Sequence, residues 1–329
     1  MDELFAQLAG APDPDEPARM AVRSRAAQVL RPTGALSRLD HVAEWLAGWQ
    51  RTSTPSVQRP AIVLAAADHG VVQRGVSAYP ADTTKAMAAA IEAGVATSAV
   101  LARHMQVSLR LIDVGVGDPT GDLSVGPAMS HGRVQWAFDS GRAAVRAIEC
   151  DLLALGEMGI GNTTAAAAVA ASLFGGPPAS WVGRGTGIDD ATLARKIEVV
   201  EIASRRMSNA SPAEVLRSVG GTEMAALAGA CMEARLQSIP VVLDGFVCTA
   251  AVAALEVAFP GALDHCVAGH LSPEPGHRLL LEALHLTPLL ALDLRLGEGS
   301  GALLALPLIK MAAAAVTEVA TFDEWDLPR

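Results

Sequence analysis

The sequence predicts an α/β fold, a parallel, doubly wound β-sheet with helices on both faces. Apolar segments with the length of buried strands alternate along the chain with longer segments of helical periodicity. Alternation of this kind is typical of parallel sheets joined by right-handed crossovers. Hydrophobic residues make up 51% of the 329 residues and aromatic residues only 4%, so Ala, Leu and Val must pack the core. Ala-rich helices pack closely, which suits helices on both faces of a sheet.

The N-terminal segment predicts two amphipathic helices. Apolar residues recur at helical spacing over residues 17–30 and 36–49, and residues 31–34 (RPTG) separate the two segments. Residues 51–60 are polar and contain prolines, so we interpret them as a linker leading to the sheet.

Five apolar segments predict the strands of the sheet. The first, residues 61–67, reads AIVLAAA and has the pattern of a buried strand. The other strands are expected at residues 107–116, 152–155, 239–243 and 263–268. Helices are expected between and after them, at residues 83–103, 165–173, 190–208, 212–218, 223–236, 248–258, 276–284 and 302–316. Ligands of such folds bind at the carboxyl ends of the strands, so the loops there are where functional residues are expected.

Charge and cysteine usage exclude several classes of protein. The formal net charge is −10 and the chain has no basic run, so we expect no nucleic-acid partner. An anionic substrate must then be held by local amides and a few Lys or Arg side chains. The cysteines form no C-x-x-C pair, which indicates reduced thiols typical of the cytosol; they are Cys150, Cys231, Cys248 and Cys266.

No export signal or membrane span is expected. The N-terminal residues MDEL are acidic and lack the apolar segment of a signal peptide. No uninterrupted apolar run reaches the ~18 residues needed to cross a bilayer. We therefore expect a soluble protein of the cytoplasm.

Residues 156–164 (GEMGIGNTT) carry the strongest functional signal. They follow an apolar strand and precede a helix-forming segment. This order builds an anion site, because glycines let the backbone approach a ligand and a helix N-terminus presents unpaired N–H groups. The run is not a P-loop, since no Gly-Lys-Ser/Thr follows, and its glycines lack the dinucleotide-binding spacing. We expect a phosphate here, although a tight turn with a capped helix would use the same residues.

Further glycine-bearing loops stand at the other expected strand ends. One phosphate-binding turn is common, but several glycine-bearing loops in one chain indicate a nucleotide bound among them. These loops are residues 68–80, 183–190, 243–246, 269–274 and 297–301. Simpler roles stay open for single residues in them: Asp189 or Asp190 as a helix N-cap, and His69 and His270 as hydrogen-bonded structural groups.

The chemistry of the site is narrowed by motifs that do not occur. The chain has no H-E-x-x-H, no carboxylate-rich magnesium motif and no Cys/His cluster, so we expect no metal. It has no G-x-S-x-G, which disfavours a serine hydrolase. Glu298 is the acid that we single out, because it lies between glycines where a flat aromatic ring could approach. A carboxylate favoured by the dipole of a helix start is the alternative. Glu157 is similarly placed.

Together these segments resemble the nicotinate-nucleotide–dimethylbenzimidazole phosphoribosyltransferase family. Residues 32–36 (PTGAL) resemble its N-terminal Pro-x-Gly-Ser-Leu element, and the likeness covers roughly residues 20–322. Ser37 departs from the glycine expected after Leu36, and the chain ends soon after Phe322. The segments that match, in the family's order, are residues 67–71 (ADHGV), 75–77 (GVS), 156–164 (GEMGIGNTT), 243–246 (LDGF) and 295–302 (RLGEGSGA).

The resemblance implies a fold and a reaction. A large Rossmann-like domain would span residues 56–300, with a small helical domain built from residues 1–55 and 301–329. Nicotinate mononucleotide would donate its 5-phosphoribosyl group to 5,6-dimethylbenzimidazole, with inversion at C1′. The products would be nicotinate and α-ribazole 5′-phosphate, the precursor of the lower ligand of cobalamin. Family members are homodimers that need neither a metal nor another cofactor.

The resemblance also implies the roles of the site residues. Glu298 would act as the general base, and Glu157 would support proton transfer or orient the ribose. Asp244 would bind ribose hydroxyls, with a structural role equally open. The benzimidazole would contact Ser77, Tyr79 and Leu296. The phosphoribosyl group would contact Gly159, Gly161, Asn162, Thr163, Gly185, Lys196 and Ser272.

Three other functions use the same residues. The acceptor could be another base or a phenol, because the donor site would be identical. The chain could be a nucleotide-binding regulator without catalysis, although Glu298, Lys196 and the complete run of residues 156–164 argue against that. A nucleosidase using water would release nicotinate without any acceptor.

Overall fold

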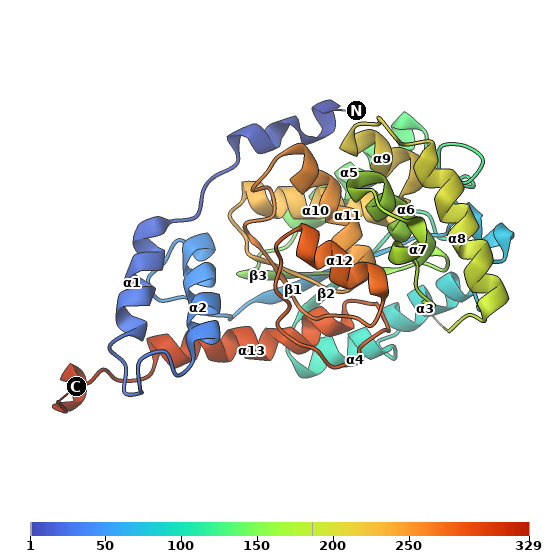
Figure 1. Ribbon diagram of the computed structural model, residues 1–329. Helices are drawn as coiled ribbons and strands as arrows, with labels where there is room; N and C mark the ends of the chain where they lie inside the picture. Colours follow the sequence, from blue (N-terminus) through green and yellow to red (C-terminus); the bar gives the residue numbers. More distant parts are fainter. Residues whose placement is uncertain (1, 186, 329) are drawn as a thin grey trace.

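A five-stranded parallel sheet forms the centre of the molecule, in a computed structural model that describes residues 2–185 and 187–328 (Figure 1). The strand order is β2-β1-β3-β4-β5. The order reverses between β1 and β3, and such a switch point is where ligands bind in open α/β sheets. The predicted α/β class and each predicted strand are confirmed, with bounds β1 (Pro60–Ala66), β2 (Ser108–Asp113), β3 (Leu152–Met158), β4 (Val241–Leu243) and β5 (Cys266–Ala268).

One face of the sheet is covered by helices from both ends of the chain. Ile62, Leu64 and Leu152 point to this face and share a buried cluster with Leu46 and Leu306. Figure 1 shows the long helix α13 running beneath the sheet. The helices of this layer are α2 (Ser37–Gln50), α3 (Thr83–Glu92), α4 (Thr97–His104) and α13 (Ser300–Thr317).

The second face carries the larger buried cluster. Two of its helices, α5 and α10, approach backbone to backbone. A Cβ built on Gly141 would lie 1.8 Å from the Ala226 carbonyl oxygen, and a Cβ built on Gly229 would lie 2.0 Å from the Phe138 carbonyl oxygen. Only glycine permits this contact at either position. The helices of this layer are α5 (His131–Arg146), α6 (Asn162–Phe174), α9 (Pro212–Val219), α10 (Thr222–Leu236) and α11 (Phe246–Ala258).

The remaining helices and 3₁₀ turns complete the fold. Asp189 caps α8, since its Oδ1 accepts the Thr192 N–H at 2.8 Å, so the simpler role proposed for this residue is confirmed. The remaining elements are α7 (Pro178–Trp181), α8 (Asp190–Arg205), α12 (Pro275–Ala283), and the 3₁₀ turns η1 (Asp2–Gly10), η2 (Gly70–Arg74) and η3 (Asp323–Trp325).

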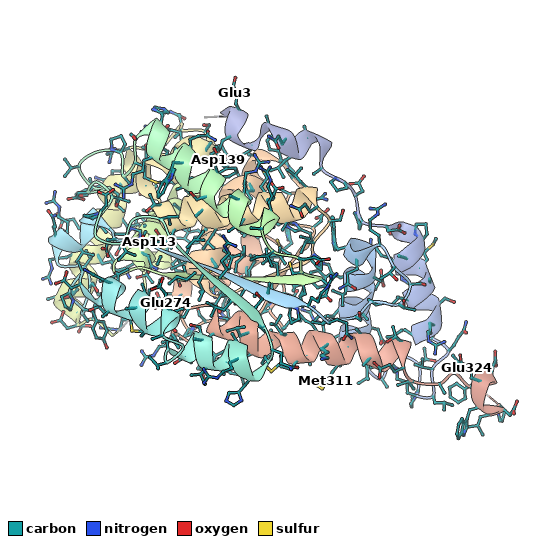
Figure 2. The ribbon with its side chains drawn as sticks, turned by 180° about the vertical axis from the view of Figure 1, so that it is seen from behind. Glu3, Asp113, Asp139, Glu274, Met311 and Glu324 are labelled. Atoms are coloured by element: carbon teal, nitrogen blue, oxygen red, sulfur yellow. The ribbon has the colours of Figure 1, made fainter. Side chains whose placement is uncertain are left out.

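The helix α1 (Glu16–Ala26) and the residues that follow it lie beside the C-terminal segment. Arg25, from α1, donates to the carbonyl oxygens of Val316 and Val319. The Leu30 N–H donates to the Ala320 carbonyl oxygen at 2.9 Å. Figure 2 shows Glu324 at the tip of this paired end. Both termini therefore contribute to one helical cluster, and the expected boundaries near residues 55 and 300 stay predictions.

Two expectations about the helices were wrong. The single helix expected at residues 83–103 is two helices, because Gly94 takes a left-handed φ of 75° and ends α3 before α4 begins. The helix α5 was not expected, since glycines and charged residues dilute its apolar pattern. By length and composition alone, residues 83–104 and α13 would suffice to cross a membrane. The segment of residues 83–104 is interrupted at Gly94, and α13 packs against the sheet. Both are therefore weak evidence of a transmembrane helix.

The expectation that the chain lacks a Cys/His cluster was also wrong. Cys231, His265 and Cys266 are buried together, with their side-chain ligand atoms within 4.8 Å of one another. The topology brings α10 beside the start of β5, which no spacing motif in the sequence reveals. All four cysteines are free thiols, as their spacing led us to expect.

Candidate active site

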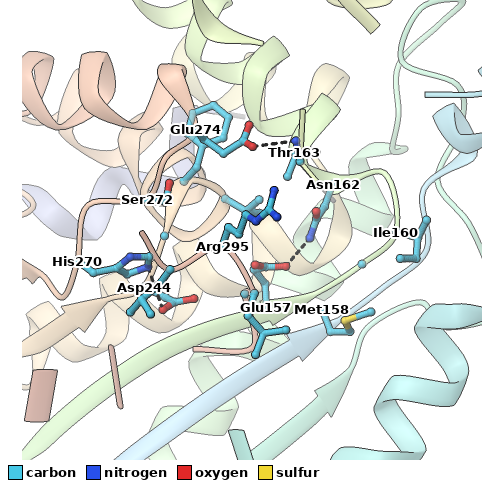
Figure 3. A pocket seen from close by; sticks show the side chains of 18 residues that line it. Glu157, Met158, Ile160, Asn162, Thr163, Asp244, His270, Ser272, Glu274 and Arg295 are labelled. Carbon is cyan, nitrogen blue, oxygen red and sulfur yellow. Dashed lines mark hydrogen bonds and ion pairs between the residues drawn. The ribbon is translucent and has the colours of Figure 1, made fainter. Parts of the chain in front are cut away.

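A cavity of about 120 Å³ opens at the carboxyl ends of β3, β4 and β5 (Figure 3). The loops that follow these strands form its walls, together with the segment that precedes α13. The carboxyl edge is where a parallel sheet places its ligands. The site residues predicted from the sequence that line the cavity are Glu157, Gly159, Asn162, Thr163, Gly185, Asp244, Ser272 and Leu296.

The glycine-rich turn is positioned by close contact with the end of β1. A Cβ on Gly159 would lie 2.7 Å from the Ala67 carbonyl oxygen, so a side chain there would push the turn outward. Gly161 has a φ of 91° and is the N-cap of α6. The Ile160 N–H donates to the Thr84 hydroxyl at 3.1 Å, which ties the turn to α3. The N-terminus of α6 therefore faces the cavity, as an anion site requires.

Glu157 is a buried acid in the cavity wall. Asn162 Nδ2 donates to Glu157 Oε2 (Figure 3). Burial raises the pKa of Glu157 to about 8, helped by the negative charges of Asp244, Glu223 and Glu298 and opposed by the Asn162 hydrogen bond. Glu157 is therefore mostly a neutral carboxylic acid at pH 7, able to donate a hydrogen bond.

Asp244 has a structural contact in addition to its place in the cavity wall. Its Oδ1 accepts the N–H groups of Gly301 and Ala302 at 2.7 and 3.0 Å, which anchors the first turn of α13. His270 Nε2 lies 3.5 Å from the same oxygen. The structural alternative for Asp244 is confirmed, and its contact with ribose stays a prediction.

Lys196 stands behind the cavity rather than in its wall. It is only 1% exposed, and its Nζ donates to Thr163 Oγ1 at 2.8 Å and to the Gly183 carbonyl oxygen at 3.1 Å. Burial lowers the pKa of Lys196 to about 8, opposed by the negative charge of Glu274. The ammonium thus positions the Thr163 hydroxyl that does line the cavity.

Ser272 belongs to a small buried network at the same end of the cavity. Its N–H lies 3.0 Å and its hydroxyl 2.9 Å from His277 Nδ1. Burial, helped by His270, lowers the pKa of His277 to about 3, so this imidazole is neutral. Nearby, the Gly185 N–H donates to Glu274 Oε1 at 2.8 Å. Both Ser272 and Gly185 therefore have protein partners in the ligand-free cavity.

Arg295 brings a cation into the cavity that the sequence did not single out. It forms no ion pair with Asp293 or Glu298 within residues 2–185 and 187–328. The side chain is exposed and points into the cavity (Figure 3). The RLGEGSGA pattern was the available signal.

Glu298 lies next to the cavity on the side of α4. Its side chain is 2% exposed, and its Oε2 accepts the N–H and the hydroxyl of Ser98 at 3.3 and 3.0 Å. Its φ is 58°, between Gly297 at 82° and Gly299 at 70°, so the backbone conformation is one that side chains rarely adopt. Ser98, near the N-terminus of α4, carried no signal in the sequence.

The residues expected around the benzimidazole are not all brought together. Leu296 lines the cavity and is 53% exposed. Ser77 and Tyr79 lie in the loop after η2, where the Ser77 hydroxyl accepts the Tyr79 N–H at 3.2 Å and the tyrosine ring is 51% exposed. Neither lines this cavity, and their contact with an acceptor stays a prediction.

His69 is a structural group at the end of β1. Its Nε2 lies 2.8 Å from Glu223 Oε1, and both side chains are fully buried. The imidazole packs against the glycine-rich turn, because a Cβ on Gly159 would meet it at 3.4 Å. The simpler role considered for His69 is therefore confirmed.

The fold and the cavity, which is faced by the N-terminus of α6, are suited to a phosphorylated ligand. A family model described as "Phosphoribosyltransferase" matches residues 11–326, so the protein is a phosphoribosyltransferase, one of the pentosyltransferases. The chain is 46% identical to the nicotinate-nucleotide–dimethylbenzimidazole phosphoribosyltransferase of Methylorubrum extorquens, over 98% of this chain and 95% of that protein. The chain belongs to that family.

Two further comparisons agree. The phosphoribosyltransferase of the same name from Cereibacter sphaeroides is 45% identical over 98% of both chains. A crystal structure of CobT from Thermus thermophilus is 44% identical, covers 95% of this chain and 99% of its own, and superposes with a TM-score of 0.92. The structural match supports the Rossmann-like fold that the resemblance implied.

Proposed function

We propose that the protein transfers the 5-phosphoribosyl group of nicotinate mononucleotide to 5,6-dimethylbenzimidazole, giving α-ribazole 5′-phosphate and nicotinate for the lower ligand of cobalamin. The observation that carries the proposal is the glycine-rich turn of residues 156–164, which presents the N-terminus of α6 to the cavity. Relatives that share nearly the whole chain bear the name of this activity.

The donor phosphate is proposed to lie at the N-terminus of α6. The amides of Gly159 and Gly161 and the hydroxyl of Thr163 are suited to a phosphate there, and Lys196 adds positive charge from behind Thr163. Gly185 and Ser272 complete the contacts by exchanging protein partners for the ligand. Arg295, which also lines the cavity, supplies a second cation for an anionic group of the nucleotide.

The ribose is proposed to sit beside Glu157 and Asp244. Protonated Glu157 donates a hydrogen bond to a ribose oxygen, and Asn162 holds its other oxygen. Asp244 is held by the start of α13, so a ribose hydroxyl bound to it meets a rigid acceptor. Both contacts position C1′, and the pyridinium of the donor is already a good leaving group.

The acceptor nitrogen is proposed to attack C1′ from the face opposite to nicotinate, which inverts the configuration from β to α. Attack makes the benzimidazole cationic, and its second ring N–H then loses a proton to Glu298. Leu296 lines the cavity two residues before Glu298, so a ring against Leu296 lies within reach of this acid. Ser98 holds Oε2, and Oε1 receives no hydrogen bond from any residue in the described part of the chain.

Positioning is expected to contribute more than proton transfer. Holding two rings across one carbon lowers a barrier by ~7–11 kcal/mol in favourable cases. A general base typically adds ~10²–10⁴-fold. From the family we also propose a homodimer in the cytoplasm, which light scattering of the purified protein and fractionation of the producing cells test.

The experiment that tests the function is an acceptor-dependence assay. Purified protein is incubated with nicotinate mononucleotide, with and without 5,6-dimethylbenzimidazole, and the products are resolved by chromatography and mass. Nicotinate and α-ribazole 5′-phosphate that form only with the benzimidazole support the transferase. Nicotinate in both tubes indicates a nucleosidase. If nicotinate forms in neither tube, the assay is repeated with adenine and with phenol as acceptors. Product with one of these indicates another acceptor, and no product indicates a protein that binds without reacting.

A further inference from the structure

Three metal-ligating side chains meet at the edge of the sheet opposite the active site. Cys231 lies on α10, and His265 and Cys266 lie at the start of β5. The two sulfur atoms are 3.6 Å apart, and His265 Nε2 lies 3.7 Å from the Cys231 sulfur and 3.8 Å from the Cys266 sulfur. Cys231 and His265 are fully buried and Cys266 is 4% exposed. The proposed reaction has no use for this cluster.

The three atoms have the separations of ligands around one ion. A point equidistant from them lies about 2.1 Å from each atom, and zinc bonds to Cys sulfur and His nitrogen measure about 2.3 and about 2.0–2.1 Å. We propose that Cys231, His265 and Cys266 form a structural site for one thiophilic metal ion, Zn²⁺ or Cu⁺. Thiolate with imidazole is a donor set that both ions prefer.

The surroundings of the cluster fix the imidazole and balance charge. Trp49 meets the His265 ring edge-on at 5.7 Å, and its Nε1 donates to the Asp264 carbonyl oxygen at 3.0 Å. The Arg235 guanidinium lies 4.4 Å from the centre of the Trp49 ring. Two thiolates and Zn²⁺ are neutral together, and with Cu⁺ the remaining negative charge is close to Arg235. A buried site therefore need not carry an uncompensated charge.

Metal binding requires one change of hydrogen bonding. Without metal, His265 Nε2 lies 3.1 Å from the Cys231 carbonyl oxygen and can donate to it. As a ligand, Nε2 carries no proton, so the proton resides on Nδ1. The Cys231 carbonyl is not orphaned, because it lies inside α10 and has the helical N–H of Arg235 as its partner.

The ion would join the second helical layer to the edge of the sheet. The strand β5 has three residues and pairs only with β4 among the named strands of the described chain, so it is a short edge strand. A metal ion that joins Cys231 of α10 to Cys266, the first residue of β5, would hold this edge in place. The site is buried and lies at the amino end of the strands, at the edge opposite the cavity, which assigns it a structural role rather than a catalytic one.

The test is the metal content of the full-length protein purified without chelators, measured by inductively coupled plasma mass spectrometry. We expect about one zinc or copper ion per chain. Cys231→Ser and Cys266→Ser are each expected to lower this content by at least about tenfold, because each removes one of the three protein ligands. Cys248→Ser is the matched control, since Cys248 is also buried but lies outside the cluster, and its metal content should equal that of the wild type.

A second measurement keeps the test valid if the serine variants fail to fold. Wild-type protein is unfolded with a chelator and refolded with Co²⁺, and thiolate-to-cobalt charge-transfer absorption is expected. Absence of bound zinc and copper together with absence of this absorption would overturn the proposal. A protein mass lower by two hydrogens, with Cys231 and Cys266 in one cross-linked peptide, would overturn it in favour of a disulfide.

Discussion

The backbone N–H of Glu298 donates to the carbonyl oxygen of Glu157 at 3.0 Å. This bond holds the loop before α13 against the end of β3, so the two acids singled out in the sequence lie on adjacent segments. The charge of Glu298 also contributes to the raised pKa of Glu157. One acid is thereby kept neutral beside a second acid that is proposed to accept a proton, a pairing typical of sites with divided acid and base roles.

Replacing Glu298 with Gln is expected to lower turnover by roughly 10²–10⁴-fold, because the amide cannot accept the benzimidazole proton. Donor binding should change little, since Glu298 lies outside the cavity wall. Steady-state kinetics with both substrates measure the two quantities. Glu318→Gln, on an exposed side chain, is the control. Turnover unchanged in Glu298→Gln would remove Glu298 as the base.

Replacing Ser98 with Ala is expected to lower kcat about tenfold, since one hydrogen bond to a charged group is worth about 1.5 kcal/mol. The Ser98 N–H remains and holds Oε2 less firmly. Ser98→Thr keeps the hydroxyl and should recover most of the loss. The KM for the donor should stay constant throughout. A kcat equal to that of the wild type in Ser98→Ala would show that the hydroxyl does not position Glu298.

The pKa of Glu157 predicts a pH dependence of stability. Its folded pKa of about 8 lies above its ordinary value of 4.5, so the folded state binds more protons between these values. The contribution of this group to the free energy of unfolding therefore falls as pH rises from 4.5 to 8, by up to about 1.4 kcal/mol per unit. Glu157→Gln should flatten the decline. Urea unfolding at several pH values measures it, and parallel curves for both proteins would contradict the assignment.

Replacing Lys196 with Met is expected mainly to weaken the binding of nicotinate mononucleotide, because the charge behind Thr163 is lost while the buried volume is kept. Lys196→Ala should do the same and also lower stability by leaving a cavity. The pKa of Lys196 near 8 predicts that wild-type affinity falls as pH rises through that value. Calorimetric titration measures both effects. Equal affinity in Lys196→Met and wild type would misplace the phosphate site.

A brief exposure to EDTA is expected to leave turnover unchanged, because no step of the proposed reaction uses a metal ion. The cluster of Cys231, His265 and Cys266 is buried at the opposite edge of the sheet and should retain an ion over minutes. Initial rates with and without the chelator measure this. A rapid loss restored by a divalent ion would contradict the metal-free mechanism. A slow loss that follows the circular dichroism signal would instead report the structural site.

Local pattern was sufficient for the sheet and for the glycine-rich turn. The AIVLAAA segment became β1 because its uniformly apolar residues suit a strand buried on both faces. Gly159 is required by its close contact with the Ala67 carbonyl oxygen, and Gly161 by its φ of 91°. Gly94 was misjudged because the apolar residues on both sides continue the helical spacing, and only its left-handed backbone separates α3 from α4.

Contacts between distant segments were not predictable. Ser98 precedes Glu298 by two hundred residues, and a lone serine near a helix start carries no signal of its own. Lys196 was expected to touch the phosphate, but whether a long side chain lines a cavity or stands behind it depends on packing. The meeting of Cys231 with His265 depends on how α10 crosses the sheet, which no motif encodes.

The helix α13 acts as a strut between two parts of the molecule. Its first turn is held by Asp244 in the cavity wall, and its last turn receives Arg25 from the opposite end of the chain. A displacement of the segment around Val316 would therefore be transmitted along α13 to the wall of the cavity. Tags or truncations near residue 320, although remote from the substrates, would act on the same helix.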